Sequence, residues 1–382
     1  MNPSIPHPGL PGIPGIPGPG LGLPTFHPET MKAWLYTTTS PTLEKSLTLH
    51  TNARAPPTPQ GNQLLIQILS TSLNRTDYQF PESLVGLGLQ RLIIGLPASP
   101  GIEFCGRITS SGPLAQHMKE GTIVYGCHDR PTQFGSLAEY IIVKADKVAI
   151  LPDGVDINSA SAISICGQAA YQALNGNVKE GSGLNSNSSV LINGGSGGCG
   201  QFAIQIAKAM GCRVTATCST RNMELCLRLG ADEVIDYTAE EDLVRKLCTR
   251  GKGMEFDCII DNVGSPSNMY YECHQFLKEE GVFVQVGAES GLTYLRAVWP
   301  AFLGGGRRKY VILRRVDDNR HLVKLGEWLG DRTIQVQTDG VYDFHDVVKA
   351  FEKLRSGHAR GKIVVRVSDP DARDMQSFGI GF

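Results

Sequence analysis

Three glycines in the middle of the chain have a spacing that suits a phosphorylated ligand. Gly195, Gly197 and Gly200 follow an apolar run at residues 189–193 and precede a run with helical periodicity at residues 201–210. In the pattern G-x-G-x-x-G the first glycine allows a tight turn, the second lets the backbone approach a pyrophosphate, and the third lets helix and strand pack closely. The N-terminus of the helix then offers unpaired N–H groups to the phosphates, whereas the alternative is a glycine-rich turn without a ligand. The predicted dinucleotide site consists of Gly195, Ser196, Gly197, Gly198, Cys199 and Gly200.

The end of the next predicted strand, at residues 213–218, bears on which dinucleotide is bound. Proteins that bind NAD place Asp or Glu at this point to accept hydrogen bonds from the ribose 2′-hydroxyl. Here the chain continues with Ser219, Thr220 and Arg221 and has no carboxylate. A guanidinium suits the oxygens of a 2′-phosphate, so Ser219 and Arg221 favour NADPH, unless Arg221 is an ordinary solvated side chain.

The elements around this loop alternate between strand and helix. Helices are expected at residues 159–174 and 223–229, and further strands at residues 233–235, 256–261, 282–286 and 310–313. Such alternation predicts a parallel sheet with helices on both faces, that is, a doubly wound α/β domain.

Residues 31–155 have a different pattern, in which short apolar runs are closely spaced between turn residues. The runs lie at residues 63–70, 107–109, 122–125, 138–143 and 148–150. They predict a β-rich domain, either a small barrel or an open sheet. Two domains also agree with a length of 382 residues, which exceeds what one hydrophobic core usually serves.

Composition excludes several kinds of protein. The 36 basic and 37 acidic side chains leave a net charge of -1, which argues against a nucleic-acid partner, and no apolar run is long enough to predict a membrane span. None of the ten cysteines forms a C-x-x-C pair, so we expect buried thiols in a reduced, cytoplasmic compartment. Residues 1–30 are rich in proline and glycine and predict a flexible arm.

Several short runs, in order, resemble the medium-chain dehydrogenase/reductase superfamily. They are residues 192–198 (INGGSGG), 229–237 (LGADEVIDY), 261–264 (DNVG), 284–287 (VQVG) and 361–365 (GKIVV). The most similar branch is that of zinc-free quinone oxidoreductases, including fungal proteins labelled zinc-binding oxidoreductases. The resemblance covers about residues 31–367. It implies a GroES-like catalytic domain at residues 31–155 and 307–367, a Rossmann domain at residues 156–306 and a tail at residues 368–382.

The resemblance also implies further cofactor contacts and an oligomeric state. The additional residues expected to contact the cofactor are Tyr237, Asn262, Val263, Val286, Gly287 and Lys362. A homodimer is expected, in which the edge strand at residues 310–313 pairs the two Rossmann sheets.

The zinc ligands of alcohol dehydrogenases can be compared with this chain position by position. Where those enzymes have Cys, His and Cys, this chain has Asn74, Ile102 and Ile165. Cys166 lies one place from the third position, but a single thiolate cannot replace a three-ligand site. We therefore expect no metal.

Without zinc, an enzyme cannot readily polarise an alcohol for oxidation. Hydride transfer to an enone or quinone depends less on a metal, because the conjugated carbonyl spreads the developing negative charge. We expect Asn74, Thr76, Asp77 and Tyr78 to lie in the cleft between the domains. Tyr78 would stabilise an enolate or deliver a proton, or it would simply pack as a half-buried tyrosine. Asn74 would orient the nicotinamide ribose or the substrate carbonyl, or it would only form a turn.

Three further residues are candidates for the substrate pocket. Gln168 lies beside Ala169, where relatives often have a threonine that approaches the nicotinamide, and Gln168 could serve instead. Glu103 is expected mainly to hold a hydrogen-bond network, and His128 lies in a loop expected near the cleft. The apolar stretch at residues 82–99 is expected either to line the substrate pocket or to pack on the core.

These observations predict an NADPH-dependent, zinc-independent reductase of α,β-unsaturated carbonyls or quinones that acts on a small-molecule substrate. A first alternative is a trans-acting enoyl reductase or tailoring reductase of fungal secondary metabolism. A carrier-bound substrate would need a basic docking surface, for which residues 307–309 and 314–315 are one candidate. A second alternative is a non-catalytic NADPH-binding protein with a structural or regulatory role.

Overall fold

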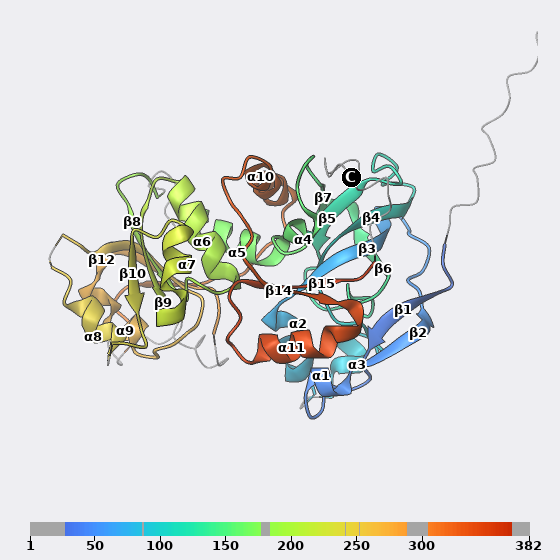
Figure 1. Ribbon diagram of the computed structural model, residues 1–382, viewed down its shortest axis with the longest axis horizontal. Coiled ribbons are helices and arrows are strands. Elements are labelled where there is room, and N and C mark those ends of the chain that lie inside the picture. The colour runs from blue at the N-terminus through green and yellow to red at the C-terminus, as the bar shows by residue number, and fades with distance from the viewer. Residues whose placement is uncertain are drawn as a thin grey trace, which may run out of the picture.

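The computed structural model describes residues 27–85, 88–176, 184–240, 242–251, 253–288 and 305–368, which form two domains lying side by side (Figure 1). The predicted arm and tail lie outside these residues, apart from residues 27–30 and Ser368. Among the described residues, no helix has both the length and the apolar character needed to cross a bilayer.

The second domain is built on a six-stranded sheet in which every neighbouring pair is parallel. Its strands are β8 (Ser189–Asn193), β9 (Arg213–Cys218), β10 (Glu233–Asp236), β11 (Phe256–Asp261), β12 (Leu277–Gln285) and β13 (Lys309–Ile312). The spatial order β10-β9-β8-β11-β12-β13 is the 3-2-1-4-5-6 order of dinucleotide-binding folds. The predicted doubly wound domain is confirmed.

The predicted boundary of this domain at residue 306 is wrong. β13 pairs with β12 and therefore completes the six-stranded sheet, so the chain returns to the first domain only after Ile312. The helices of the second domain are α6 (Gly198–Ala209), α7 (Met223–Arg228), α8 (Leu243–Cys248) and α9 (Met269–Glu272).

The first domain is built on a seven-stranded sheet, which confirms the predicted β-rich domain. Its strands are β3 (Gln63–Leu73), β4 (Glu103–Ser111), β5 (Ile123–Cys127), β6 (Tyr140–Lys144), β7 (Val148–Ile150), β14 (Thr338–Asp343) and β15 (Lys362–Arg366). A separate hairpin is formed by β1 (Thr30–Leu35) and β2 (Thr48–Arg54). The helices are α1 (Leu43–Ser46), α2 (Arg75–Ser83), α3 (Gln90–Ile93), α4 (Ile157–Ala160) and α11 (Val347–Arg355). β15, the last of the described strands, lies inside this sheet, between β14 and β3.

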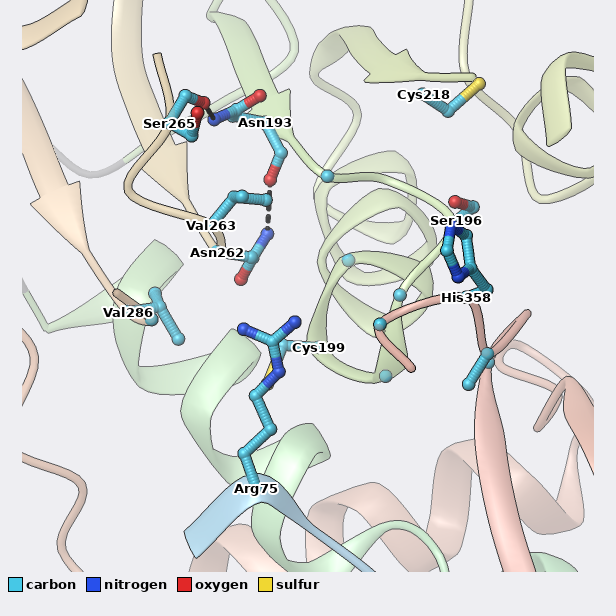
Figure 2. A pocket seen from close by; sticks show the side chains of 18 of the residues that line it. Arg75, Asn193, Ser196, Cys199, Cys218, Asn262, Val263, Ser265, Val286 and His358 are labelled. Carbon is cyan, nitrogen blue, oxygen red and sulfur yellow. Dashed lines mark hydrogen bonds between the residues drawn. The ribbon is translucent and has the colours of Figure 1, made fainter. Parts of the chain in front are cut away.

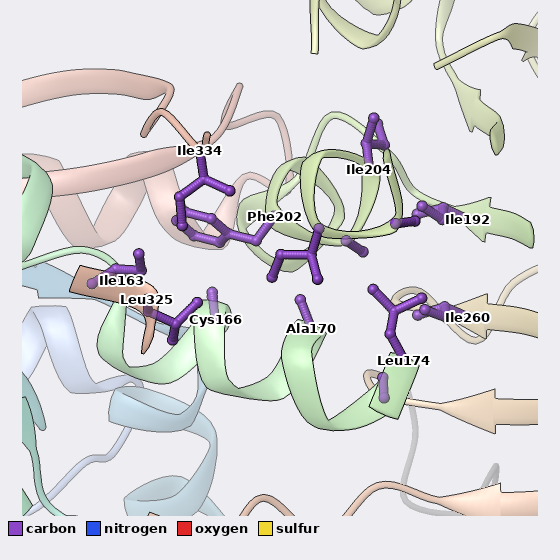
Figure 3. Packing of buried hydrophobic residues seen from close by; sticks show 14 of the residues in the cluster. Ile163, Cys166, Ala170, Leu174, Ile192, Phe202, Ile204, Ile260, Leu325 and Ile334 are labelled. Carbon is purple, nitrogen blue, oxygen red and sulfur yellow. The ribbon is translucent and has the colours of Figure 1, made fainter. Parts of the chain in front are cut away.

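Helix α5 (Ser164–Asn175) lies between the two domains and packs against α6 (Figures 1 and 3). Its residues Ala170 and Leu174 belong to the same buried cluster as Phe202 of α6 and Ile192 of β8. Helix α10 (Asn319–Gly330) adds Leu325 to this cluster. The helix predicted at residues 159–174 is in fact two helices, because α4 ends at Ala160 and α5 begins at Ser164.

The apolar stretch at residues 82–99 packs on the core of the first domain. Leu84 and Ile94 are buried in one cluster with Tyr36 and Phe351, whereas Leu92 is exposed. Leu87 lies outside the described residues. Of the two alternatives for this stretch, the structure supports packing on the core.

Candidate active site

A cleft of about 770 Å³ lies between the two domains, beside the point where the order of the parallel sheet reverses. Ligands of doubly wound sheets bind at this switch point, outside the carboxyl ends of the strands. One wall comes from the second domain, and the other comes from the start of α2, the start of α5 and the turn before β15.

The glycine loop forms the floor of the cleft, and its glycines are required for different reasons. A Cβ on Gly200 would lie 2.1 Å from the carbonyl oxygen of Gly194, and a Cβ on Gly195 would lie 2.9 Å from the Cβ of Ala216. A Cβ on Gly197 would meet no protein atom closer than 3.5 Å. Gly195 and Gly200 therefore allow close packing, whereas Gly197 leaves room for a ligand on the cleft side.

Buried hydrogen bonds between strand ends hold this loop in place. Thr217 Oγ1 donates to Asn193 Oδ1 at 2.6 Å and accepts from the N–H of Gly194 at 3.1 Å. Asn193 Nδ2 donates in turn to Asp261 Oδ1 at 2.8 Å. The ends of β8, β9 and β11 are thereby tied together around the first glycine.

The cofactor contacts expected beyond the loop lie where a dinucleotide would need them. Asn262, Val263, Val286 and Gly287 line the cleft at the ends of β11 and β12 (Figure 2). The buried Oδ1 of Asn262 has no hydrogen-bond partner among the described residues. An amide or hydroxyl donor on a ligand would satisfy it, so these residues fit the nicotinamide half of the cofactor.

The other end of the cleft is polar and carries the predicted 2′-phosphate residues. Ser219, Arg221 and Tyr237 line it, and Asn222 Nδ2 donates to Ser219 Oγ and Ser196 Oγ, each at 3.1 Å.

The turn before β15 also contributes to this end, which the sequence analysis did not predict. His358 lines the cleft (Figure 2), and Arg360 donates to the carbonyl oxygen of Arg221 at 3.3 Å. In the sequence, these two residues could have been found from their basic side chains and their position just before Gly361 and Lys362.

A largely buried polar cluster forms part of the opposite wall, with Asn74, Cys166 and Lys362 lining the cleft. Lys362 Nζ donates to Glu103 Oε1 at 2.6 Å and to Asn74 Oδ1 at 2.7 Å, and it lies 3.6 Å from Cys166 Sγ. Asn74 Nδ2 also donates to Glu103 Oε1, at 2.8 Å, and Glu103 Oε2 accepts from the N–H of Ile165 at 2.8 Å. Burial opposes the charge of Lys362, but the neighbouring Cys166 and Glu103 raise its pKa above the usual value.

This cluster bears on the roles expected for three predicted site residues. Asn74 lines the cleft, but its amide is committed to Glu103, Lys362 and Ser72, so it does not offer a free group to the ribose or to a substrate. Lys362 also lines the cleft, but its ammonium is bound to Glu103 and Asn74, and its expected contact with the cofactor stays a prediction. Glu103 is fully buried and lies outside the cleft lining, so it holds the network as expected but does not contact a substrate.

The residues present do not fit a catalytic zinc. Asn74, Ile102 and Ile165 occupy the three ligand positions, and the Lys362 ammonium lies among Glu103, Asn74 and Cys166 at the place of a cation. Within the described ranges, no group of three or more His, Cys, Asp or Glu side chains could hold a metal ion.

Thr76 and Arg75 reach into the cleft from the first turn of α2. Both are exposed and line the cleft. Figure 2 shows the Arg75 side chain extending toward Asn262 and the glycine loop. Arg75 was not predicted, although its place between Asn74 and Thr76 was the available signal.

Tyr78 does not face the cleft, which corrects the role expected for it. Its ring is buried among apolar side chains of the first domain, and the Arg355 guanidinium lies 4.2 Å from the ring centroid. On helix α2, Tyr78 and Thr76 point in different directions, and only Thr76 lines the cleft. Of the two alternatives for Tyr78, the structure supports a packing tyrosine.

Gln168 and His128 are also absent from the cleft lining, contrary to expectation. Gln168 is fully buried; it donates to the carbonyl oxygen of Ser164 at 2.8 Å and accepts from the N–H of Asp318 at 3.1 Å. Desolvation lowers the pKa of His128 to about 4, so its imidazole is neutral at neutral pH. Both residues serve the packing around α5 and β5.

The ten cysteines are free thiols, and eight of them are buried. Cys199 and Cys218 line the cleft together with Cys166.

Comparison with known proteins agrees with this architecture. Family models described as "Alcohol dehydrogenase GroES-like domain" and "Zinc-binding dehydrogenase" match residues 60–153 and 229–365. The chain is 37% identical to the trans-enoyl reductase pgmF of Aspergillus terreus, over 90% of this chain and 98% of that protein. It is 33% identical to the 2-methylene-furan-3-one reductase of Solanum lycopersicum, over 88% of this chain and 79% of that protein.

Solved structures give the same result. The quinone oxidoreductase from Coxiella burnetii superposes with a TM-score of 0.74 at 28% identity, over 88% of this chain and 99% of that one. With its GroES-like and Rossmann domains and the nicotinamide-dinucleotide cleft between them, the chain belongs to the medium-chain dehydrogenase/reductase superfamily and is an oxidoreductase.

Proposed function

We propose that the protein is an NADPH-dependent reductase of carbon–carbon double bonds conjugated to a carbonyl group. The observation that supports this most directly is the wall opposite the glycine loop. It carries a hydroxyl at Thr76 and a guanidinium at Arg75, whereas the Lys362 ammonium is bound to Asn74, which stands at one of the positions that the resemblance matches to a zinc ligand. An enone accepts hydride without a metal, because its conjugated carbonyl carries the developing negative charge.

The chain's own residues have distinct tasks in this reaction. When bound, the reduced nicotinamide supplies a hydride to the β-carbon of the substrate. The Thr76 hydroxyl donates a hydrogen bond to the carbonyl oxygen as charge develops there, and a water molecule in the cleft gives its proton to the α-carbon. The Arg75 guanidinium, which faces the glycine loop, balances the charge of the pyrophosphate. Gly197 leaves the space that the pyrophosphate requires.

Enoyl thioesters are the favoured substrates, and the observation behind this choice is the 37% identity to a trans-enoyl reductase. A carrier-bound thioester would also need a docking surface. Of the basic residues considered for it, Arg307, Lys309 and Arg314 are exposed, whereas Arg308 donates to the carbonyl oxygens of Leu277 and His274. Quinones are the second candidate, because the solved structure with 28% identity is named a quinone oxidoreductase.

The test follows NADPH oxidation with a short enoyl thioester, a simple enone and a quinone, with and without a metal chelator. We expect fastest turnover with the thioester and no effect of the chelator. Thr76→Val should lower kcat by about 10- to 100-fold, because it removes one hydrogen-bond donor to the developing oxyanion. Tyr78→Phe is the matched control and should retain activity. Measurable NADPH binding without turnover of any substrate would overturn the proposal.

A further inference from the structure

Two thiols meet at the edge of the cleft, and the proposed reduction uses neither. Cys166 lies in the first turn of α5 and Cys199 in the first turn of α6, and both line the cleft. The two thiols are close enough that each shifts the pKa of the other. The contact is close to the loop as well, since a Cβ on Gly198 would lie 3.2 Å from Cys166 Sγ.

The charges around this pair favour a thiolate on Cys166. The Lys362 ammonium lies 3.6 Å from the Cys166 sulfur, and Asn74 Oδ1, which accepts from the S–H of the neutral thiol, lies 3.5 Å from it. The neighbouring Cys199 thiol and the Lys362 charge lower the pKa of Cys166 below the usual value of a thiol, although burial and the Glu103 carboxylate oppose the shift. The neighbouring Cys166 and burial raise the pKa of Cys199. A thiolate beside a second thiol is the arrangement in which oxidation leads to a disulfide.

We propose that Cys166 and Cys199 are a redox-modification site at which a peroxide converts the two thiols into a disulfide. The Cys166 thiolate attacks one peroxide oxygen, the O–O bond breaks, and the leaving hydroxide takes up a proton to become water. The sulfur of Cys199 then attacks the sulfenic acid, its proton leaves with the displaced hydroxyl as a second water, and the S–S bond forms. Two electrons pass from the sulfurs to hydrogen peroxide, which is reduced to two waters.

The position of the pair links this modification to the cofactor, and in this respect the inference rests on the proposed function. A disulfide requires the two sulfurs to approach to about 2.05 Å, which draws the start of α6 toward α5. The same turn of α6 carries Gly198 and Gly200, so its displacement alters the phosphate site. A bound dinucleotide would lie over this turn and shield Cys199. Cofactor binding and disulfide formation should therefore oppose each other.

A second thiol pair in the same domain provides a control. Cys218 and Cys226 also shift the pKa of each other, and Cys218 also lines the cleft. The charged group that acts on Cys218 is the Asp236 carboxylate, which opposes a thiolate, and no cation acts on either thiol of this pair. The second pair should consequently oxidise more slowly.

The experiment exposes the intact protein to hydrogen peroxide, blocks the remaining thiols, and maps disulfides by mass spectrometry. We expect one disulfide, between Cys166 and Cys199, that is reversed by dithiothreitol. It should be lost in Cys166→Ser and in Cys199→Ser and retained in Cys226→Ser. NADPH at about 100 times its Kd should slow its formation by up to about 100-fold, because only the free enzyme reacts.

Mapping the first disulfide to Cys218 and Cys226, or finding none, would overturn the proposal. Mapping on the wild-type protein does not depend on the folding of the variants, and circular dichroism of each serine variant checks their fold. The disulfide is measured without turnover, so a protein that forms it but reduces no substrate would contradict the proposed function alone. A disulfide at Cys166 and Cys199 whose formation NADPH does not slow would contradict the link to the cofactor.

Discussion

Asp77 is fully buried. It is absent from the cleft lining, contrary to the expectation that it lies in the cleft. One of its carboxylate oxygens accepts from the N–H of Asn74 at 2.7 Å, and the other has no hydrogen-bond partner among the described residues. Desolvation, together with the nearby Glu103 charge, raises the pKa of Asp77 to about 8. The side chain is therefore a neutral acid at neutral pH, and it caps α2 in that form.

This pKa makes the stability of the protein depend on pH. An unfolded Asp titrates near 4, so the folded protein retains a proton that the unfolded chain releases, and stability falls as pH rises from about 4 through 8. Asp77→Asn keeps a neutral acceptor for the cap. It should exceed the wild type in free energy of unfolding by on the order of 2 kcal/mol at about pH 9, and by less at about pH 5. Urea denaturation measures both values.

The matched control for this prediction is Glu279→Gln, which neutralises an exposed carboxylate. It should show no such pH-dependent gap. A wild-type stability that does not change between these pH values would contradict a protonated Asp77.

Arg221 is the residue on which the choice of NADPH depends. It is exposed at the polar end of the cleft, beside Ser219 and the Arg360 side chain. Arg221→Ala should weaken NADPH binding by about 10- to 100-fold and NADH binding very little, because a charged hydrogen bond contributes roughly 1.5–3 kcal/mol. Fluorescence titration with both cofactors measures this, with Arg228→Ala on α7 as the control. Equal weakening of both cofactors would show that Arg221 does not bind a 2′-phosphate.

At the scale of single residues, the sequence predicted where the cofactor binds better than which side chains are free to act. The glycine loop could be predicted because its function depends on local spacing. The role of Asn74 could not, because its amide is bound by Lys362 and Glu103, which lie 288 and 29 residues away along the chain. The orientation of Tyr78 depends on how α2 packs, and no local pattern encodes it.

At the scale of elements, the loop between β8 and α6 contains glycines that are required for two different reasons, ligand binding at Gly197 and close packing at Gly200. Gly197→Ala should leave the melting temperature unchanged and weaken NADPH binding by at least about tenfold, because the added methyl meets only the ligand. Gly200→Ala should lower the melting temperature as well, because its methyl would collide with the carbonyl oxygen of Gly194. Thermal unfolding with and without NADPH distinguishes the two effects.

Gly251→Ala is the control, since a Cβ there meets nothing within 4 Å. If Gly197→Ala proved as unstable as Gly200→Ala, the loop would not be shaped by the ligand in the way described.

The elements of the second domain were predicted well, because buried parallel strands form continuous apolar runs. The strands predicted at residues 189–193, 213–218 and 256–261 coincide with β8, β9 and β11. The hairpin of β1 and β2 was missed, since five of the seven residues of β2 are exposed and give no clear alternation. Helices α10 and α11 were also missed, although both have one buried apolar face.

At the scale of the molecule, the six-stranded sheet ends in β13, which pairs with β12 alone among the described strands. We expect two copies to join along this edge, as the resemblance to the superfamily implies. Ile312→Lys should convert the dimer into a monomer, as measured by light scattering. Val341→Lys, on edge strand β14 of the other sheet, should leave the dimer intact. A wild-type monomer would refute the expected dimer.

The pairing of β15 with β3 affects the order in which the two sheets can fold during synthesis on the ribosome. Residues 189–312 contain every strand of the second sheet, so that sheet can assemble while the rest of the chain is still being made. The first sheet must wait, because β3 lacks one of its neighbours until residues 362–366 have emerged. During synthesis, β3 therefore keeps one unpaired edge until β15 has emerged. The first sheet is completed after the second sheet, although its strand β3 is made earlier.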